Sequence, residues 1–389
     1  MKRIYLDYNA TTPLKPQVYE AMVPYFKELY GNPSSIHWAG QAGKEALMVA
    51  REKVANLFHV DPQEVVFTSG GTEANNLALK GVFGVFQKKW QKKGRHIITT
   101  QVEHKSILEC CDYLKKQGAE ISYISVHPNG QIHLEELKAQ IRPDTILISV
   151  QAANNETGVL MPLKEISDIA QAHNILFHVD AVQMAGKKAL FLDELPMDLV
   201  SISSHKIYGP KGAGALIIRR ALKLEALLHG GNQERKRRGG TENVPAIVGF
   251  GTACEWAQKE SASEAQRLEE LRNKLEEGIF ATIPQSLIHG KDSPRVSNTL
   301  NVSFKGLEAE GLLLNLDLKG IATSSGSACS SGSLDPSHVL LAMGVSPENA
   351  LSSIRFSLGY QTQKEDIEFV LEVLPEMVQR LRSLNEACR

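Results

Sequence analysis

The amino-acid sequence predicts an α/β protein, with a large domain built on a mostly parallel sheet flanked by helices and a smaller α+β domain. Two observations carry this prediction. Short apolar runs alternate with helical stretches through the first half of the chain, which is the pattern of a parallel sheet covered by helices. The 389 residues are too many for one small core and suit two domains of one subunit.

Five apolar runs in the first half are predicted strands. They cover residues 64–68, 96–100, 145–150, 175–180 and 197–203. Helical patterns follow from Ala74 and after His104. Such sheets bind their ligands outside the carboxyl ends of the strands. Five polar residues lie just past these ends and are expected to share one edge: Thr72, His104, Asn155, Asp180 and Lys206.

The second half changes character. Charge-rich helical sequence from about 253 to 279 is expected to include a long connecting helix. Strands are expected at 298–304 and 352–358, and an amphipathic helix from Lys364 to the end. This mixture predicts the smaller α+β domain.

Composition excludes several classes of function. Hydrophobic residues make up 42% and charged residues 22% of the chain, as is typical of a soluble globular enzyme. The net charge of −1 shows no overall excess of basic residues of the kind that binds nucleic acid. No apolar stretch is long enough to span a bilayer, and the first residues do not read as a secretion signal. Five cysteines, an odd number, favour a reducing cytoplasm over a disulfide framework, and no His/Cys spacing suggests a metal site.

Lys206 is the most informative residue. It follows the predicted strand that ends at Ser203, where its amine could form a Schiff base with pyridoxal phosphate (PLP). An exposed surface lysine is the alternative. Asp180 could pair with the pyridine nitrogen of PLP, and Gln183 could hydrogen-bond its phenolic oxygen. A helix cap for Asp180 and plain solvent exposure for Gln183 are the alternatives.

Two further segments at the same edge suit such a cofactor. Gly71 and Thr72 lead into a helix, whose free N–H groups could bind a phosphate. The alternative is an ordinary N-cap formed by Thr72. The flat ring of His104 could stack on the cofactor and move protons, whereas a packed or surface histidine is the ordinary alternative.

Cys329 lies in the Ser- and Gly-rich segment 324–333. Buried structural cysteines are usually flanked by apolar residues, so this thiol is expected on a loop, where as a thiolate it could act as a nucleophile. A cysteine in a flexible linker is the alternative. Cys110, Cys111 and Cys254 lie in helical patterns and are expected to be packing residues.

Two basic features remain. Arg355 lies inside a predicted strand, where its guanidinium would suit a substrate carboxylate or, alternatively, an internal salt bridge. The basic run 233–238 precedes Thr241. It is either a solvated loop or an arm that offers Thr241 to the phosphate of a neighbouring subunit.

Taken together, these motifs resemble the PLP-dependent cysteine desulfurases of the NifS/IscS type, within the class V aminotransferase superfamily. The serine-rich context of Cys329 is similar to that of the long-loop group I enzymes. The resemblance covers essentially the whole chain and rests on residues 5–13, 31–37, 69–76, 103–104, 154–158, 180–183, 203–206, the Cys329 loop and 353–355.

The resemblance implies PLP fold type I, with a seven-stranded sheet in a large domain of residues 13–255 and a small domain of residues 1–12 with 256–389. It implies that Lys206 carries the cofactor and shuttles the α-proton, that His104 stacks on PLP, and that Cys329 attacks the substrate sulfur. Asn155 and Arg355 would hold the substrate carboxylate. The implied cofactor-binding set is Gly71, Thr72, His104, Asn155, Asp180, Gln183, Ser203, His205, Lys206 and, from the partner of a homodimer, Thr241.

The implied reaction converts L-cysteine to L-alanine and leaves a persulfide on Cys329. That sulfur would pass to an acceptor protein, such as an iron–sulfur scaffold, for iron–sulfur cluster assembly or tRNA thiolation, without direct contact to nucleic acid or membrane. Two alternatives stay open. One is a selenocysteine lyase or an aminotransferase with the same cofactor. The other is a sulfur-relay or scaffold protein without turnover, against which the intact Lys206, Asp180 and Cys329 argue.

Overall fold

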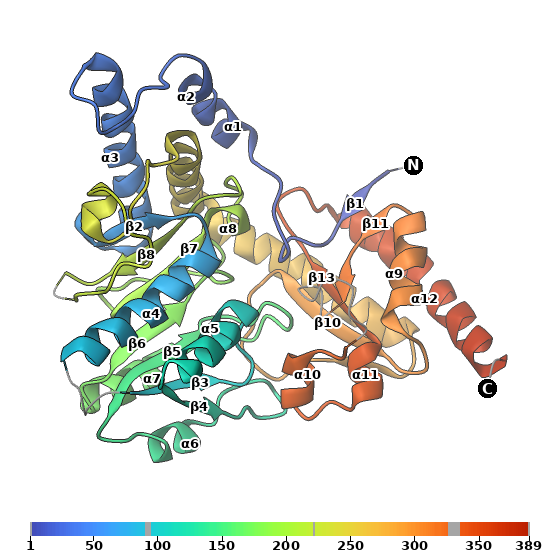
Figure 1. Cartoon of the computed structure of the whole chain (residues 1–389). Coiled ribbons are helices and arrows are strands. Elements are labelled where there is room, and N and C mark those ends of the chain that lie inside the picture. Colours follow the sequence, from blue (N-terminus) through green and yellow to red (C-terminus); the bar gives the residue numbers. More distant parts are fainter. Residues whose placement is uncertain (1, 90–94, 221, 326–334, 388–389) are drawn as a thin grey trace.

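The computed structural model describes residues 2–89, 95–220, 222–325 and 335–387. Its largest sheet has seven strands in the order β2-β8-β7-β6-β5-β3-β4 (Figure 1). The strands are β2 (Val65–Thr68), β3 (His96–Thr100), β4 (Glu120–Ile124), β5 (Thr145–Gln151), β6 (Leu176–Asp180), β7 (Leu199–Ser203) and β8 (Gly214–Ile218). Only β8 runs antiparallel to its neighbours, which confirms the mostly parallel α/β architecture.

Helices cover both faces of this sheet, and alternate residues of each strand point to opposite layers. Val66 packs with α4 (Gly71–Lys89) and α5 (Lys105–Lys116), whereas Phe67 packs with α3 (Trp38–Phe58) and the first part of α8 (Val244–Thr282). α7 (Leu163–Ala172) lies on the same side as α3. Because both faces are covered, every residue of β2, β3, β5, β7 and β8 is buried, and burial does not alternate along these strands.

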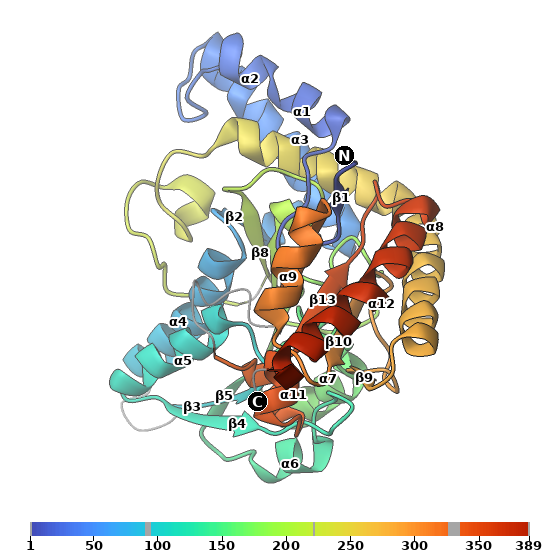
Figure 2. The same cartoon turned by 90° about the vertical axis from the view of Figure 1, so that its right-hand side faces the viewer.

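The second lobe is built on a four-stranded sheet with the order β12-β13-β10-β9. These strands are β9 (Ser286–Ile288), β10 (Thr299–Phe304), β12 (Ser324–Ser325) and β13 (Ser353–Ser357), and they pair antiparallel. Their apolar side chains form one cluster with α9 (Ala309–Leu318), α12 (Lys364–Ala387) and the second part of α8. Figure 2 shows α9 and α12 side by side over this sheet.

The N-terminal segment belongs to this second cluster as well. β1 (Ile4–Tyr5) pairs in parallel with β11 (Ile321–Ala322), and Ile4 and Leu6 are buried with the apolar residues of the second lobe. The remaining short elements are α1 (Pro16–Met22), α2 (Pro24–Lys27), α6 (Leu134–Ala139), α10 (His338–Ala342), α11 (Pro347–Leu351), and single turns at Pro62–Glu64, Ser204–Lys206 and Gln233–Lys236.

α8 connects the two lobes. Its residues up to Cys254 pack in the core of the large sheet, and those from Leu268 onward pack in the second cluster. The predicted domain boundaries, 13–255 and 1–12 with 256–389, fit this division of the cores, and we retain them as a proposal. Within the residues described, no helix has the length and apolar character needed to cross a membrane.

Some element boundaries differ from the sequence predictions. α8 begins at Val244, nine residues before the predicted start, because Asn243 caps it by accepting a hydrogen bond from Ala246 N and because proline occupies its first turn. α4 begins at Gly71 and not at Ala74, so Thr72 lies inside the helix and is not its N-cap. The edge strand β4 and the antiparallel strand β8 were not identified from the sequence.

Candidate functional site

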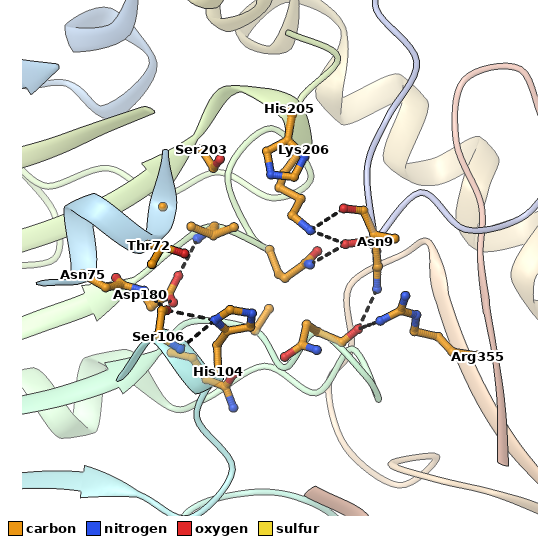
Figure 3. A pocket seen from close by; sticks show the side chains of 17 residues that line it. Asn9, Thr72, Asn75, His104, Ser106, Asp180, Ser203, His205, Lys206 and Arg355 are labelled. Carbon is orange, nitrogen blue, oxygen red and sulfur yellow. Dashed lines mark hydrogen bonds between the residues drawn. The ribbon is translucent and has the colours of Figure 1, made fainter. Parts of the chain in front are cut away.

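A pocket of about 390 Å³ lies at the carboxyl ends of the central strands, where the two lobes meet. Figure 3 shows side chains from the large sheet, the N-terminal segment and β13 pointing into it. The pocket brings together ten of the predicted site residues: Gly71, Thr72, His104, Asn155, Asp180, Gln183, Ser203, His205, Lys206 and Arg355. The expected shared edge of the sheet is therefore present.

Lys206 ends the single turn that follows β7, and it lines the pocket. Its Nζ donates hydrogen bonds to the backbone carbonyl oxygens of Asn9 at 2.5 Å and Ala10 at 2.8 Å (Figure 3). The side chain is partly buried, so the alternative of a fully exposed surface lysine does not hold. Asn9 is not among the predicted site residues, although it lies within a motif of the family resemblance.

Asp180 is the last residue of β6, and its carboxylate is buried at the floor of the pocket. Oδ1 accepts a hydrogen bond from Val182 N at 3.0 Å, and Oδ2 accepts one from Asn75 Nδ2 at 2.8 Å. No helix follows directly, which rules out the helix-cap alternative. Asn75 was missed by the sequence analysis, although it lies one helical turn past Gly71 and therefore faces the same edge.

His104 is the N-cap of α5, and its Nδ1 accepts a hydrogen bond from Ser106 N at 3.1 Å. Because that nitrogen acts as an acceptor, the proton of the neutral imidazole must be on Nε2. Burial lowers the pKa of His104, against the opposing effect of the Asp180 charge. The hydroxyl of Ser106 lies 2.8 Å from Nδ1 and accepts from Asn75 Nδ2 at 2.8 Å. One polar network thus links Asp180 to His104.

The other end of the pocket is suited to an anion. Ser203 Oγ is buried and has no hydrogen-bond partner among the described residues. A Cβ added to Gly71 would lie 2.8 Å from Val182 Cγ2, so only glycine lets the α4 N-terminus stand this close to the pocket. Nδ1 of His205 lies 3.1 Å from Thr11 Oγ1, and burial, together with the charges of Lys206 and Lys211, lowers the pKa of His205 to about 4.

Arg355 is buried in β13, with its guanidinium at the pocket wall. Its Nη2 donates to Asp7 Oδ1 at 2.8 Å and its Nη1 donates to the backbone carbonyl of Asn155 at 3.0 Å. The internal salt bridge considered as an alternative is therefore present. Nε of Arg355 has no partner among the described residues, so its N–H is a buried donor that these residues leave unused.

Other predicted features lie elsewhere. Thr241 is exposed and does not line this pocket, and Cys329 lies outside the described residues. The basic run 233–238 is not freely solvated, because Arg51 pairs with Glu234 and Arg238 pairs with Glu73. Cys110, Cys111 and Cys254 are buried in helices, as expected. No group of three or more potential metal ligands occurs in the part of the chain described.

The residues present fit PLP. A buried carboxylate lies where a pyridine nitrogen could be paired, an amine is close by, and a helix N-terminus with an unpartnered serine hydroxyl offers donors to a phosphate. The pocket volume of about 390 Å³ falls within the range of small-molecule sites. Lys206, Asp180, His104, Gln183, Ser203 and Thr72 would hold the cofactor.

Comparisons with known proteins agree with this site. The family described as "Aminotransferase class-V" matches residues 4–370. A protein named cysteine desulfurase IscS from Dictyoglomus turgidum is 49% identical over 99% of this chain and 97% of its own length. A protein of the same name from Methanosarcina thermophila is 48% identical over 99% and 94%.

Two solved structures are also similar. One, titled as a NifS-like protein, has a TM-score of 0.91 and 39% identity, covering 98% of this chain and 100% of its own. The other, described as SspA in complex with cysteine, has a TM-score of 0.81 and 37% identity, covering 92% of this chain and 99% of its own.

Proposed function

Because this chain belongs to the class-V aminotransferase family, we propose that it is a PLP-dependent cysteine desulfurase. The proposed reaction converts L-cysteine to L-alanine and leaves the sulfur as a persulfide on Cys329. Relatives named cysteine desulfurase IscS match nearly the whole chain, and a structural neighbour is described in complex with cysteine.

The observation that carries the proposal is the convergence of one amine, one buried carboxylate and one buried guanidinium on a single pocket. Lys206 lies in the turn after β7 and Asp180 ends β6, both in the large lobe, whereas Arg355 lies in β13 of the second lobe. Surface ion pairs do not require this arrangement. A cofactor with a pyridine ring and a substrate with a carboxylate together require all three groups.

PLP supplies an electron sink for the α-carbon of the substrate. Lys206 Nζ is the base that takes the α-proton from the substrate and later returns a proton to the carbon fragment that becomes L-alanine. Asp180, held by Asn75 and by Val182 N, is the carboxylate that would pair with the pyridine nitrogen. His104, neutral and protonated on Nε2, presents a flat ring and one fixed donor. Arg355 orients the substrate carboxylate, with the backbone of Asn155 holding the guanidinium.

Sulfur transfer balances without an added oxidant. A bond forms between Cys329 Sγ and the substrate sulfur, and the Cβ–S bond of the substrate breaks, with its electron pair left on the carbon fragment that becomes L-alanine. The thiol proton of Cys329 is lost as the thiolate forms, and a proton is taken up by the carbon fragment. The products are L-alanine and the Cys329 persulfide, which a thiol acceptor or reductant then discharges.

The direct test measures alanine and sulfide released from L-cysteine in the presence of dithiothreitol. The PLP-loaded wild-type chain should release both in equal amounts. Cys329→Ala should retain the visible absorption of bound PLP but release neither product. The control Cys388→Ala, at a cysteine outside the Ser- and Gly-rich segment, should match wild type. If Cys329→Ala retains full turnover, a lyase or an aminotransferase without a thiol nucleophile replaces this proposal.

A homodimer with shared sites is part of the proposal. Thr241 is exposed and absent from its own pocket, and large apolar side chains are exposed around α1 to α3: Tyr19, Phe26, Tyr30, Ile36 and Trp38. Exposed apolar patches mark interaction surfaces. A hybrid test is decisive: subunits carrying Lys206→Ala mixed with subunits carrying Thr241→Ala should regain activity, because one site per hybrid then has both residues.

The persulfide would pass to an acceptor protein for iron–sulfur cluster assembly, in the cytoplasm, and the same persulfide would also serve tRNA thiolation. These roles follow from the family resemblance. Incubating the chain with ³⁵S-cysteine and purified acceptors would test them. Label should appear on a scaffold or thiolation protein only when Cys329 is present.

A further inference from the structure

Lys187 lies behind two residues of the pocket wall, Asn9 and Gln183, and is not among the predicted site residues. It lies seven residues past Asp180, in the turn-rich segment that follows β6. Its Nζ donates to Gln183 Oε1 at 2.9 Å and to Asn9 Oδ1 at 3.0 Å. Both of these amide side chains line the pocket, so Lys187 is one hydrogen bond away from it.

This contact fixes the orientation of the Gln183 amide. Gln183 Nε2 donates to the Asn9 backbone carbonyl at 3.0 Å, while its oxygen faces the Lys187 amine. The reversed amide would set oxygen against oxygen at one end and donor against donor at the other. Lys206 Nζ donates to the same carbonyl of Asn9. The NH₂ of Gln183 and the amine of Lys206 therefore converge on one oxygen.

Lys187 also holds Asn9, whose carbonyl receives both of those groups. Asn9 Oδ1 accepts from Lys187 and, at 3.1 Å, from Asn298 Nδ2. Its Nδ2 donates to Asn155 O at 3.1 Å and to Thr299 Oγ1 at 2.8 Å. Both the oxygen and the nitrogen of the Asn9 side-chain amide are hydrogen-bonded. The Asn9 peptide, whose carbonyl faces Lys206, is therefore held in one orientation.

The surroundings of Lys187 explain why an amine can hold the amide oxygens of Gln183 and Asn9. Burial lowers the pKa of Lys187 well below its ordinary value, and the positive charges of Lys206 and Arg355 lower it further. Even the neutral amine retains two N–H donors, one for each of the two amide oxygens. Lys187 also lines a small cavity together with Lys206 and Glu264.

We propose that Lys187 is a positioning residue that keeps the Gln183 NH₂ directed at the ring oxygen of PLP and the Asn9 carbonyl against Lys206. This inference rests on the proposed function, because it takes PLP as the ligand. It adds a specific prediction: removing one amine that does not touch the cofactor changes the electronic state of the cofactor.

The experiment compares Lys187→Met with Lys188→Met, its exposed neighbour. Apo protein is titrated with PLP to obtain Kd, and the loaded protein is titrated with pH while its visible absorption is followed. Lys187→Met should weaken PLP binding about 3- to 10-fold and shift the midpoint of the absorption change by about half a unit to one unit, the scale of one hydrogen bond. Lys188→Met should match wild type in both.

A double variant separates positioning from loss of charge or folding. In the Gln183→Leu background, Lys187→Met should add little to the spectral shift, because the group it orients is gone. If the full shift persists in that background, or if Lys187→Met alone leaves the midpoint unchanged, the positioning role is wrong. A wild-type chain that binds no PLP would instead overturn the proposed function itself.

Discussion

Arg355 Nη2 lies 2.8 Å from Asp7 Oδ1, and this contact joins the N-terminal segment to β13 across the wall of the pocket. The guanidinium is buried, a second nitrogen is bound to the Asn155 carbonyl at 3.0 Å, and Nε has no partner among the described residues. A planar fork can keep both contacts and still offer one donor. The ammonium group of a lysine, a point charge on a flexible chain, cannot keep both contacts and offer a further donor.

Replacing Arg355 with lysine should therefore damage substrate binding more than chemistry. Lysine keeps the charge but cannot reach Asp7, the Asn155 carbonyl and a substrate carboxylate together. We expect KM for L-cysteine to rise about 10- to 100-fold, the scale of a lost charge-assisted hydrogen bond, with the absorption of bound PLP unchanged. Steady-state kinetics check this. A fall in kcat at constant KM would contradict it.

Ser203 and Ser204 form a matched pair for testing the phosphate end. Both hydroxyls are buried without a partner among the described residues, but only Ser203 lines the pocket. Removing an unpaired buried hydroxyl costs the apo protein little. Ser203→Ala should weaken PLP binding about 5- to 10-fold, as one lost hydrogen bond to an anion would, while apo stability stays near wild type.

Ser204→Ala supplies the control for that prediction, since it should leave both PLP affinity and apo stability unchanged. Equal loss of affinity in the two variants would mean that the effect comes from the backbone turn and not from a contact to phosphate.

His178 makes the fold sensitive to acid. Its ring is buried between Ser149 Oγ at 2.8 Å and Ser201 Oγ at 2.9 Å, and burial lowers its pKa to about 3. The unfolded chain binds the proton near pH 6.5, so the stabilisation is complete above that pH and is lost as pH falls towards 3. Between pH 7 and pH 5 the loss should be about 2 kcal/mol.

Urea unfolding of wild type and His178→Asn at pH 7 and pH 5 measures this directly. The variant should lose less unfolding free energy than wild type over that interval, by about the 2 kcal/mol that one buried neutral histidine contributes. His173→Asn, at an exposed position, is the control and should follow wild type. An identical pH dependence in all three proteins would show that His178 does not control acid sensitivity.

Much of the site could be predicted because its residues lie at the carboxyl ends of the parallel strands. Asp180, His104 and Lys206 each follow an apolar run, and the geometry of parallel sheets places such residues on one edge. This reasoning needed no knowledge of long-range contacts. The family resemblance then implied seven strands, but β4 and β8 were not located in the sequence. Nothing local in Gly214–Ile218 shows that β8 runs in the opposite direction to its neighbours.

Residues that act through long-range contacts could not be predicted in this way. Asn9 meets Lys206 across 197 positions of sequence, and no local pattern marks such a pair. Lys187 lies beside a second lysine, and its hydrogen bond to Asn9 spans 178 positions of sequence, so it forms only when the segment after β6 meets the N-terminal segment. Asn75 was within reach, because helical periodicity places it one turn past Gly71.

The last prediction concerns Lys15, whose ammonium group is enclosed by aromatic rings from distant parts of the chain. Its Nζ lies 4.0 Å from the ring centroids of Trp256 and Tyr360 and 5.6 Å from that of Tyr208. Burial lowers the pKa of Lys15, opposed by the charges of Glu264 and Glu260. Tyr208 follows β7 in the large lobe, whereas Trp256 lies in the connecting helix α8 and Tyr360 just past β13, so the contact fastens the segment before α1 to both lobes.

Lys15→Met keeps the length of the side chain but removes its charge, and it should lower the free energy of unfolding by about 1–2 kcal/mol, the scale of a desolvated cation–π contact. Lys44→Met, at an exposed position, should have no effect. In a double-mutant cycle with Trp256→Leu, the two losses should sum to more than the double variant shows. Strictly additive losses would mean that Lys15 stabilises the junction by packing its methylene chain and not through the rings.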